Sequence, residues 1–194
     1  MNDNNGRQYR LLWLVALLAL VLSFVSYSRT RGEDDIMSIN QLNLTGPEDQ
    51  TIFRLSAPLP NPIVRGEELQ RSSKVYGLQF LDDEGNEMGG LGTIPDMKAG
   101  ILCFDHETAE AMCFTKVQDS LRISLFNKPE EGTTLGEAGA TRLSIGLDKS
   151  EGTAFIVLAD NQGLPRIRMS VGEDGEPRLE FWDADGELIQ SLPQ

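Results

Sequence analysis

Apolar and polar side chains alternate with a period of two through most of the chain after residue 74. The alternation is clearest in residues 121–125, 143–147 and 167–171, where every second side chain is apolar. This period predicts strands with one face on a core and the other in water. No stretch after residue 31 shows a helical period with caps. The predicted fold class is therefore mainly β: a single N-terminal transmembrane helix followed by an antiparallel β-meander of hairpins.

A short repeat near the C-terminus supports the hairpins. Gly163-Leu-Pro-Arg-Ile167 recurs as Gly175-Glu-Pro-Arg-Leu179, and a further turn follows at Gly186. A repeat of about 11–12 residues matches one strand plus one tight turn, which is shorter than the usual solenoid units. Glycine supplies the positive φ of such turns, and proline at the entry of a strand loses no ladder hydrogen bond.

The segments are assigned from this pattern and from composition. Prolines 58, 60 and 62 mark a connector without apolar period, and the turn-like Gly46-Pro-Glu-Asp49 separates two strand-like runs. The predicted order is a tail (1–10), a transmembrane helix (11–28), a spacer (29–38), a first hairpin (39–56), the connector (57–74) and an antiparallel β domain (75–194).

The transmembrane prediction rests on 17 uncharged residues, 11–27, between two pairs of arginines. As a helix they extend about 26 Å, close to the thickness of a bilayer core. The predicted membrane-interface anchors are aromatic and basic: Tyr9, Arg10, Trp13, Tyr27 and Arg29. A cleaved signal peptide is the alternative, with small residues at Ser26 and Ser28. A short tail before a first span places residues 32–194 outside the cytoplasm, so the predicted location is the bacterial inner membrane.

Small residues form a stripe on the predicted helix. Ala16, Ala19, Ser23 and Ser26 are spaced three or four apart, so they fall on one side. Small side chains let helices approach closely in lipid, and the stripe is a candidate helix-packing interface. Alanine and serine are also common in membrane spans generally, which is the alternative explanation.

Charge separates the chain into two parts. The net charge is −13, and residues 32–194 hold 13 basic and 29 acidic residues. Nucleic-acid binding is not expected, because it needs basic patches that neutralise phosphates. One histidine and two cysteines are too few for a typical His/Cys metal centre, which uses four such ligands. No cofactor is predicted.

Four turns resemble fragments of calcium loops: Asp82-Asp-Glu-Gly-Asn86, Asp160-Asn-Gln-Gly163, Glu173-Asp-Gly175 and Asp183-Ala-Asp-Gly-Glu187. None has the 12-residue frame closed by a bidentate glutamate. Asp-x-x-Gly is also what a hairpin turn needs. We interpret all four as turns, with Asp183 and Asp185 kept as weak calcium candidates.

Cys103 and Cys113 would face each other in a hairpin centred on Thr108, which makes them a candidate disulfide. The alternative is two small buried side chains. His106 lies in the turn of that hairpin, and no catalytic motif places a nucleophile or an acid beside it. No catalytic residue is predicted.

Trp182 is the candidate partner contact. Leu179 and Phe181 alternate onto one face of a strand, which sends Glu180 and Trp182 to the other. An exposed indole is a typical hot spot of protein interfaces. The alternative is that a second layer covers it.

Several segments also resemble a group of bacterial, membrane-anchored β-repeat proteins without established activity. The likeness spans residues 36–194 and is most specific at Glu84-Gly-Asn-Glu-Met-Gly-Gly90. This chain departs from the pattern at Asn127-Lys128-Pro129 and at Ala109-Glu110-Ala111. The other matching segments are Leu42–Leu44, Tyr76–Leu91, Phe104-Asp105, Leu121–Pro129 and Asp183–Gly186. The resemblance implies a fold and no catalytic residues.

Together these features predict a non-catalytic, single-pass accessory subunit. Its partners would be the bilayer and an integral membrane protein complex, which it stabilises through its helix and β domain. By analogy of form, the complex could be an energy-converting one such as a bacterial photosynthetic reaction centre with its antenna. Two alternatives remain open: a free-standing envelope module that binds a polymer or calcium, and a hydrolase built on clustered carboxylates.

Overall fold

The structure is a computed structural model, and it describes residues 38–193. Contacts divide the chain into two units, Met1–Ile39 and Asn40–Gln194. The described elements are β1 (Gln41–Thr45), β2 (Thr51–Ser56), β3 (Ile63–Val64), β4 (Glu67–Glu68), β5 (Tyr76–Leu81), β6 (Glu87–Ile94), the 3₁₀ turn η1 (Pro95–Met97), β7 (Ala99–Asp105), β8 (Glu110–Val117), β9 (Ser120–Phe126), β10 (Thr141–Asp148), β11 (Thr153–Ala159), β12 (Pro165–Val171), β13 (Pro177–Trp182) and β14 (Leu188–Leu192).

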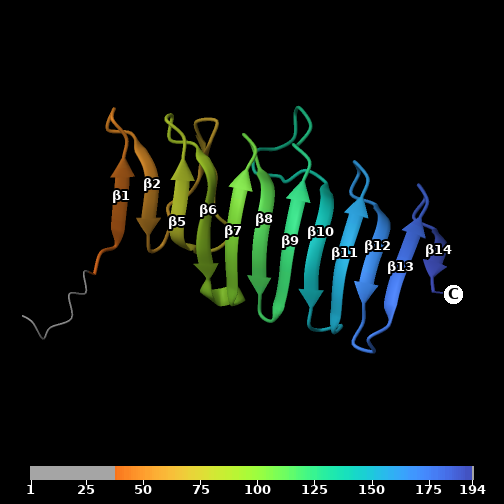
Figure 1. Cartoon of the computed structure of the whole chain (residues 1–194). Helices are drawn as coiled ribbons and strands as arrows, with labels where there is room; N and C mark the ends of the chain where they lie inside the picture. Colours follow the sequence, from red (N-terminus) through yellow and green to blue (C-terminus); the bar gives the residue numbers. More distant parts are fainter. Residues whose placement is uncertain (1–37, 194) are drawn as a thin grey trace, which may run out of the picture. The chain divides into compact units, whose positions relative to one another are not determined.

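Twelve strands form one antiparallel sheet in which almost every strand pairs with its neighbour in sequence (Figure 1). The order is β1-β2-β5-β6-β7-β8-β9-β10-β11-β12-β13-β14, so the sheet is open with β1 and β14 at its edges. β3 and β4 form a separate two-stranded ribbon. The prediction of a mainly β, antiparallel meander is confirmed.

The first hairpin belongs to the same sheet as the rest. β2 pairs with β5 across the connector, with Phe53 opposite Phe80 and Leu55 opposite Leu78. The connector therefore leaves the sheet, forms the β3–β4 ribbon and returns to the adjacent position.

Repeated tight turns join the strands. At the β11–β12 turn, the Gly163 N–H donates to the Asp160 carbonyl (3.0 Å), and the Asp160 N–H donates to the Leu164 carbonyl (2.9 Å). Gly163 has φ +84°, the left-handed conformation that closes a three-residue hairpin loop. The β5–β6 and β13–β14 turns repeat both hydrogen bonds. The Asp-x-x-Gly sequences thus fold as hairpin turns.

The most buried part of the molecule lies where the connector packs on one face of the sheet. Leu59 and Val75 of the connector are 7% exposed, and Gln79 of β5 is 1% exposed. Gly92 of β6 permits this contact, because a Cβ there would lie 2.6 Å from Cγ1 of Val75. The chain therefore packs closely over this part of the sheet.

The opposite face differs from the sequence prediction. The period of two led us to expect the apolar side chains on a core, yet no described residue covers them. The described residues form one large sheet, and the segments that leave it lie on the more polar face. The predicted transmembrane helix lies outside the described residues; within residues 38–193, no helix is long and apolar enough to cross a membrane.

Candidate interaction surface

Strand register aligns the apolar side chains into rows that cross the sheet. Each strand contributes one residue to a central apolar row, which runs through Leu42, Leu55, Leu78, Leu91, Leu102, Phe114, Ile123, Ile145, Ile156, Met169, Leu179 and Leu192. Directly paired side chains on one face of antiparallel strands lie within about 5.5 Å of each other. The row is therefore a continuous apolar band from β1 to β14.

Two further rows flank this band on the same face. The aromatic row contains Leu44, Phe53, Phe80, Gly89, Phe104, Met112, Leu125, Leu143, Leu158, Ile167, Phe181 and Gln190. The short row contains Tyr76, Thr93, Gly100, Lys116, Leu121, Leu147, Ala154, Val171 and Pro177. We call the three rows together the apolar face.

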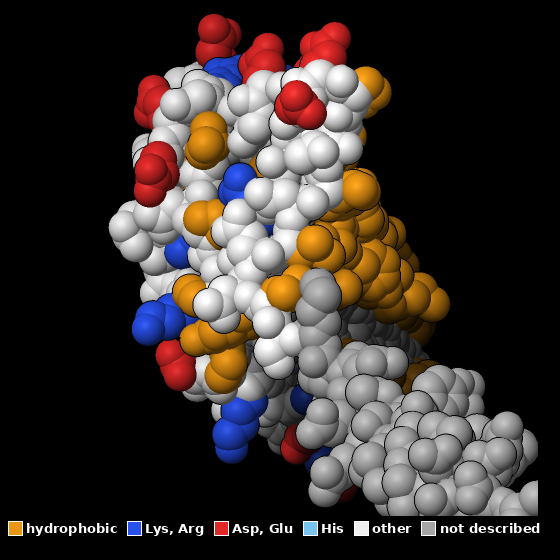
Figure 2. Space-filling model, turned by 90° about the vertical axis from the view of Figure 1, so that its left-hand side faces the viewer, with side chains coloured by type: hydrophobic (Ala, Val, Ile, Leu, Met, Phe, Trp, Pro, Cys, Tyr) orange, Lys and Arg blue, Asp and Glu red, His pale blue; other side chains and the backbone are white. Residues whose placement is uncertain are grey.

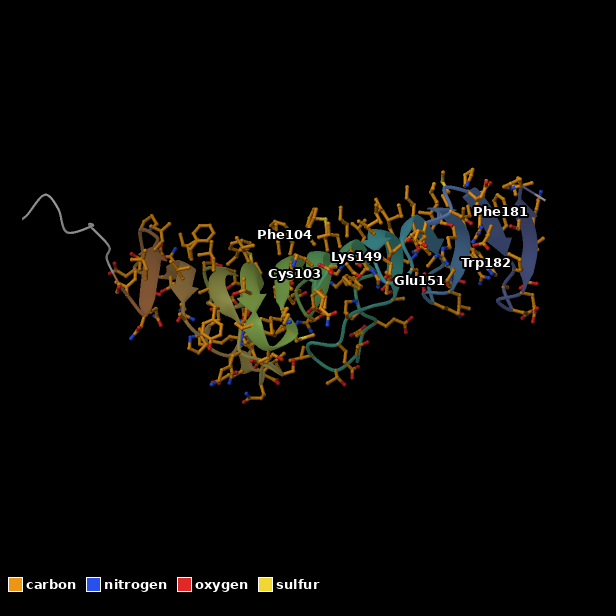
Figure 3. The ribbon with its side chains drawn as sticks, turned by 90° about the horizontal axis from the view of Figure 1, so that it is seen from below. Cys103, Phe104, Lys149, Glu151, Phe181 and Trp182 are labelled. Atoms are coloured by element: carbon orange, nitrogen blue, oxygen red, sulfur yellow. A yellow bond between two sulfur atoms is a disulfide. The ribbon has the colours of Figure 1, made fainter. Side chains whose placement is uncertain are left out.

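Solvent reaches much of the apolar face. Leu91, Leu121 and Met169 are each about half exposed. Hydrophobic side chains gather along one side of the sheet in the space-filling view (Figure 2), and Phe104 and Phe181 project from one side of the ribbon (Figure 3). Monomeric proteins rarely expose apolar patches larger than a few hundred Å². This face is therefore the strongest candidate for an interaction site in the described chain.

Three phenylalanine rings pack against each other on the apolar face, across strands β2 to β7. The Phe53 and Phe80 rings meet edge to face with centroids 5.7 Å apart, and the Phe80 and Phe104 rings lie 5.9 Å apart. Gly89 occupies the strand position between Phe80 and Phe104, so the two rings can lean together over it. The aromatic surface is thus preorganised by packing within the sheet.

Two shallow hollows indent the same face. One, of about 580 Å³, lies over β6–β10 and includes Leu91, Phe114 and Ile145; the other, of about 570 Å³, lies over β10–β14 and includes Ile156 and Met169. Grooves of this kind can receive side chains from a packed layer. The hollows lie along the central apolar row.

The opposite face carries a polar cleft of about 340 Å³ under the connector. Arg71 Nη2 of the connector lies 2.7 Å from Glu87 Oε2, and both side chains are mostly buried. Gln79 Nε2 donates to the same carboxylate oxygen at 2.8 Å, and Arg71 Nε donates to the Pro60 carbonyl at 2.7 Å. This network ties the connector to the sheet.

Asp105 lies at the same cleft. Burial raises its pKa to about 7, and the neighbouring carboxylates of Glu87 and Glu110 add to this rise, while Arg71 opposes it. His106 Nε2 lies 3.3 Å from the Phe126 carbonyl oxygen. Sequence reasoning did not single out Asp105, because its proximity to Glu87 arises only from strand pairing.

A disulfide joins Cys103 and Cys113 across β7 and β8, with Cα atoms 4.2 Å apart. The two residues are directly opposed in the hairpin, as the spacing around Thr108 predicts. Both lie on the face opposite the apolar rows, because Leu102, Phe104 and Phe114 occupy the other side. The bond fixes the register of β7 and β8 beside the cleft.

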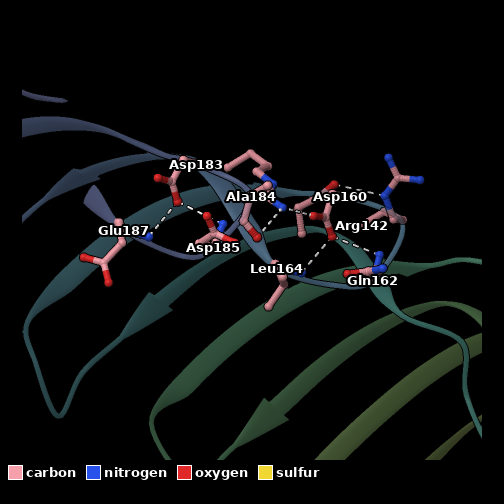
Figure 4. A network of polar contacts seen from close by, with 10 residues as sticks. Arg142, Asp160, Gln162, Leu164, Asp183, Ala184, Asp185 and Glu187 are labelled. Carbon is pink, nitrogen blue, oxygen red and sulfur yellow. Dashed lines mark hydrogen bonds and ion pairs between the residues drawn. The ribbon is translucent and has the colours of Figure 1, made fainter. Parts of the chain in front are cut away.

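The acidic turns use their carboxylates internally (Figure 4). Asp183 Oδ1 accepts hydrogen bonds from the Asp185 and Glu187 N–H groups at 2.9 Å each. Asp160 Oδ1 does the same for Gln162 (2.9 Å) and Leu164 (3.0 Å). Among residues 38–193, no group of acidic, histidine or cysteine side chains is arranged to hold a metal ion. Asp183 therefore acts as a turn-capping residue in this structure.

Trp182 lies at the end of β13 and is partly exposed. It is paired with Leu188 next to a register shift. Side chains alternate between the two faces along a strand, so Trp182 points to the face opposite that of Phe181 and away from the apolar face. Trp182 and the apolar face therefore belong to different surfaces.

The helix-packing stripe (Ala16, Ala19, Ser23, Ser26) and the membrane-interface anchors (Tyr9, Arg10, Trp13, Tyr27, Arg29) lie outside the described residues. The apolar face is the feature that sequence reasoning missed. The signal for it was present: every predicted strand carries an apolar residue, and no second set of strands remains to cover them.

Comparison with known proteins does not assign this chain to a family. No protein-family model matches this chain, and no curated protein matches it. The resemblance to bacterial β-repeat proteins stays a prediction.

Proposed function

We propose that this protein is a non-catalytic, membrane-anchored structural subunit that acts by packing the apolar face of its sheet against another protein surface. The observation that carries the proposal is the central apolar row, which supplies one apolar side chain from each of the 12 strands. A binding surface of this extent suits assembly better than turnover of a small substrate.

The size of the apolar face supports a stable contact. With strands about 4.8 Å apart and about 20 Å long, 12 strands present an area on the order of 1,100 Å². An interface usually buries about 800 Å² on each partner. Burial of apolar area stabilises by about 25 cal/mol per Å², before the cost of association is subtracted. Leaving such a face in water is therefore unfavourable, and a partner surface removes that cost.

The sequence adds the membrane context. A predicted span precedes the sheet, and the predicted topology places the sheet outside the cytoplasm. A subunit anchored in this way meets its partner at high local concentration, which strengthens a contact without new interactions. The partner we propose is a component of a membrane protein complex, either another subunit or a second copy of this chain, and the contact stabilises that complex.

Extraction of the full chain from native membranes tests the proposal. The chain is tagged at Gln194, extracted in mild detergent, separated on a native gel and analysed by mass spectrometry. Ile145→Lys places a charge in the central apolar row, and Ser144→Lys on the opposite face of the same strand is the matched control. We expect the unaltered chain and the control to migrate in a larger assembly, and Ile145→Lys to lose it. A lone chain without any substitution would refute the proposal.

A second pair of variants separates the helix from the sheet. Ala19→Leu combined with Ser23→Leu removes the small-residue stripe while leaving the sheet unchanged. If the stripe contributes to docking, this variant also loses its partner; unchanged co-migration assigns docking to the sheet alone.

One observation favours carboxylate chemistry as a second candidate. A carboxyl group with a pKa of about 7 in a cleft has the titration behaviour of a general acid or base. Purified full-length chain would be assayed against glycoside and peptide substrates across pH. Activity that is lost in Asp105→Asn and inflects near pH 7 would support hydrolysis; its absence in the unaltered chain would leave the structural role.

A further inference from the structure

We propose that the apolar face packs against a second copy of this chain, so that two sheets form a two-layer sandwich. This inference rests on the proposed function, because it requires the apolar face to be an interface. It goes further by naming the occupant.

Size is the first reason for a second copy. The face spans about 55 Å across its 12 strands and about 20 Å along them. A second sheet of the same length and twist can cover all of it, since sheets pack face to face about 10 Å apart with their strands rotated by about 30°. The pair would bury about 2,200 Å² in total, which lies in the range of permanent homodimers.

Residues 38–193 offer no cover of this size. The connector and the segment between β9 and β10 both border the polar cleft on the other face, where the Gly136 N–H donates to the Thr108 carbonyl at 2.9 Å. The 17 uncharged residues 11–27, as the predicted helix about 26 Å long and 10 Å wide, would cover about a quarter of the face. A larger surface is needed.

Charge is the second reason. Two copies of a chain with net charge −13 repel each other unless their carboxylates stay away from the contact. Within the three described rows, the ionisable side chains are Tyr76 and Lys116, and neither carries a carboxyl group. The acidic side chains lie at turns such as Asp82, Asp160 and Asp183 or on the other face. The contact area therefore contains no carboxylate, and its one lysine in each copy lies in the short row, near the end of β8.

Symmetry makes the geometry testable. A dimer between identical faces has a two-fold axis, and residues near the axis contact the same region of the other copy. The middle of the 12-strand order falls between β8 and β9. Phe114 on β8 belongs to the central apolar row and is 39% exposed, so it lies near the axis of any pair that covers the whole face.

The experiment is site-specific photocrosslinking of the full-length chain in native membranes. A photoreactive benzoyl-phenylalanine replaces Phe114, a change that keeps the ring. The matched control places the same probe at Thr115, the next residue along β8, which faces the other way. Two differently tagged copies are expressed together, and adducts are identified by mass spectrometry.

We expect the probe at 114 to give an adduct of twice the 21.4 kDa of the chain that carries both tags, and the probe at 115 to give none. An adduct at 114 with a different protein would overturn the second-copy inference and leave the proposed function standing. An adduct with lipid alone, or no adduct with any protein, would overturn both.

Discussion

The two faces of the sheet differ in how far the described chain covers them. On the polar face, the connector lies over the strands and buries Gln79 and the Arg71–Glu87 ion pair. On the apolar face, all 12 strands contribute apolar side chains, and many of them, such as Leu91, Leu121 and Met169, are about half exposed in the described chain. The comparison shows that the path of the connector, and not the hydrophobicity of the strands, decides which face the chain itself covers.

The contacts also differ in kind. The polar face has directional contacts, since hydrogen bonds hold the connector in one place. The apolar face provides a large hydrophobic area but no directional contacts, apart from the packed rings of Phe53, Phe80 and Phe104. A specific intramolecular cover and a surface suited to another protein can therefore coexist on one sheet.

The largest effect on stability is expected from Arg71→Ala. It leaves the mostly buried Glu87 carboxylate without its counter-charge and releases the hydrogen bond to Pro60, so we expect a loss of about 3–5 kcal/mol in unfolding free energy. The measurement is chemical denaturation of the full chain in mild detergent. Arg65→Ala is the control: its ion pair with Glu107 is half exposed and should contribute little. Equal effects of the two variants would contradict the description of the polar face.

Asp105→Asn should stabilise the protein at neutral pH. The folded pKa of about 7 lies above the ordinary value of 3.8, so the folded state binds an extra proton between these pH values. The unfolding free energy therefore falls as pH rises from about 4 to about 7 and stays low above that range. Asparagine removes this dependence and should gain up to about 4 kcal/mol at pH 8 and almost nothing at pH 4. A variant with an unchanged pH profile would show that Asp105 does not titrate near neutrality.

Removing the disulfide should cost about 2–3 kcal/mol, the value expected for a closed loop of this length. The comparison is Cys103→Ser with Cys113→Ser against the unaltered chain by denaturation. Thiol labelling of the native protein after unfolding should detect no free cysteine. Two free thiols, with no loss of stability in the double variant, would contradict the crosslink.

The smallest loss of unfolding free energy is expected from a substitution on the apolar face, measured on the monomer. Leu91→Ala should change the unfolding free energy by less than about 1 kcal/mol, because the side chain is half exposed. Leu81→Ala, on the same hairpin but 3% exposed, should cost about 2–5 kcal/mol. A large loss in Leu91→Ala measured on the monomer would mean that something within the chain covers this face.

Much of the fold could be predicted from local pattern. Alternation in residues 121–125, 143–147 and 167–171 predicted β9, β10 and β12, and the Gly-x-Pro-Arg repeat coincides with the starts of β12 and β13. Turns at Asp160 and Asp183 follow from local chemistry, since glycine and aspartate favour them over short range. The pairing of β2 with β5 could not be predicted, because it depends on where an aperiodic connector returns.

The sequence by itself determined that this protein is built of antiparallel hairpins, that Cys103 and Cys113 oppose each other, and that acidic residues concentrate at turns. These properties depend on neighbours a few residues apart, whose spacing is fixed by the backbone. Only the tertiary structure decided which face is covered, where Asp105 meets Glu87, and that apolar side chains align across all 12 strands. Those properties depend on register and on the route of the connector, which bring distant residues together and carry no local signature.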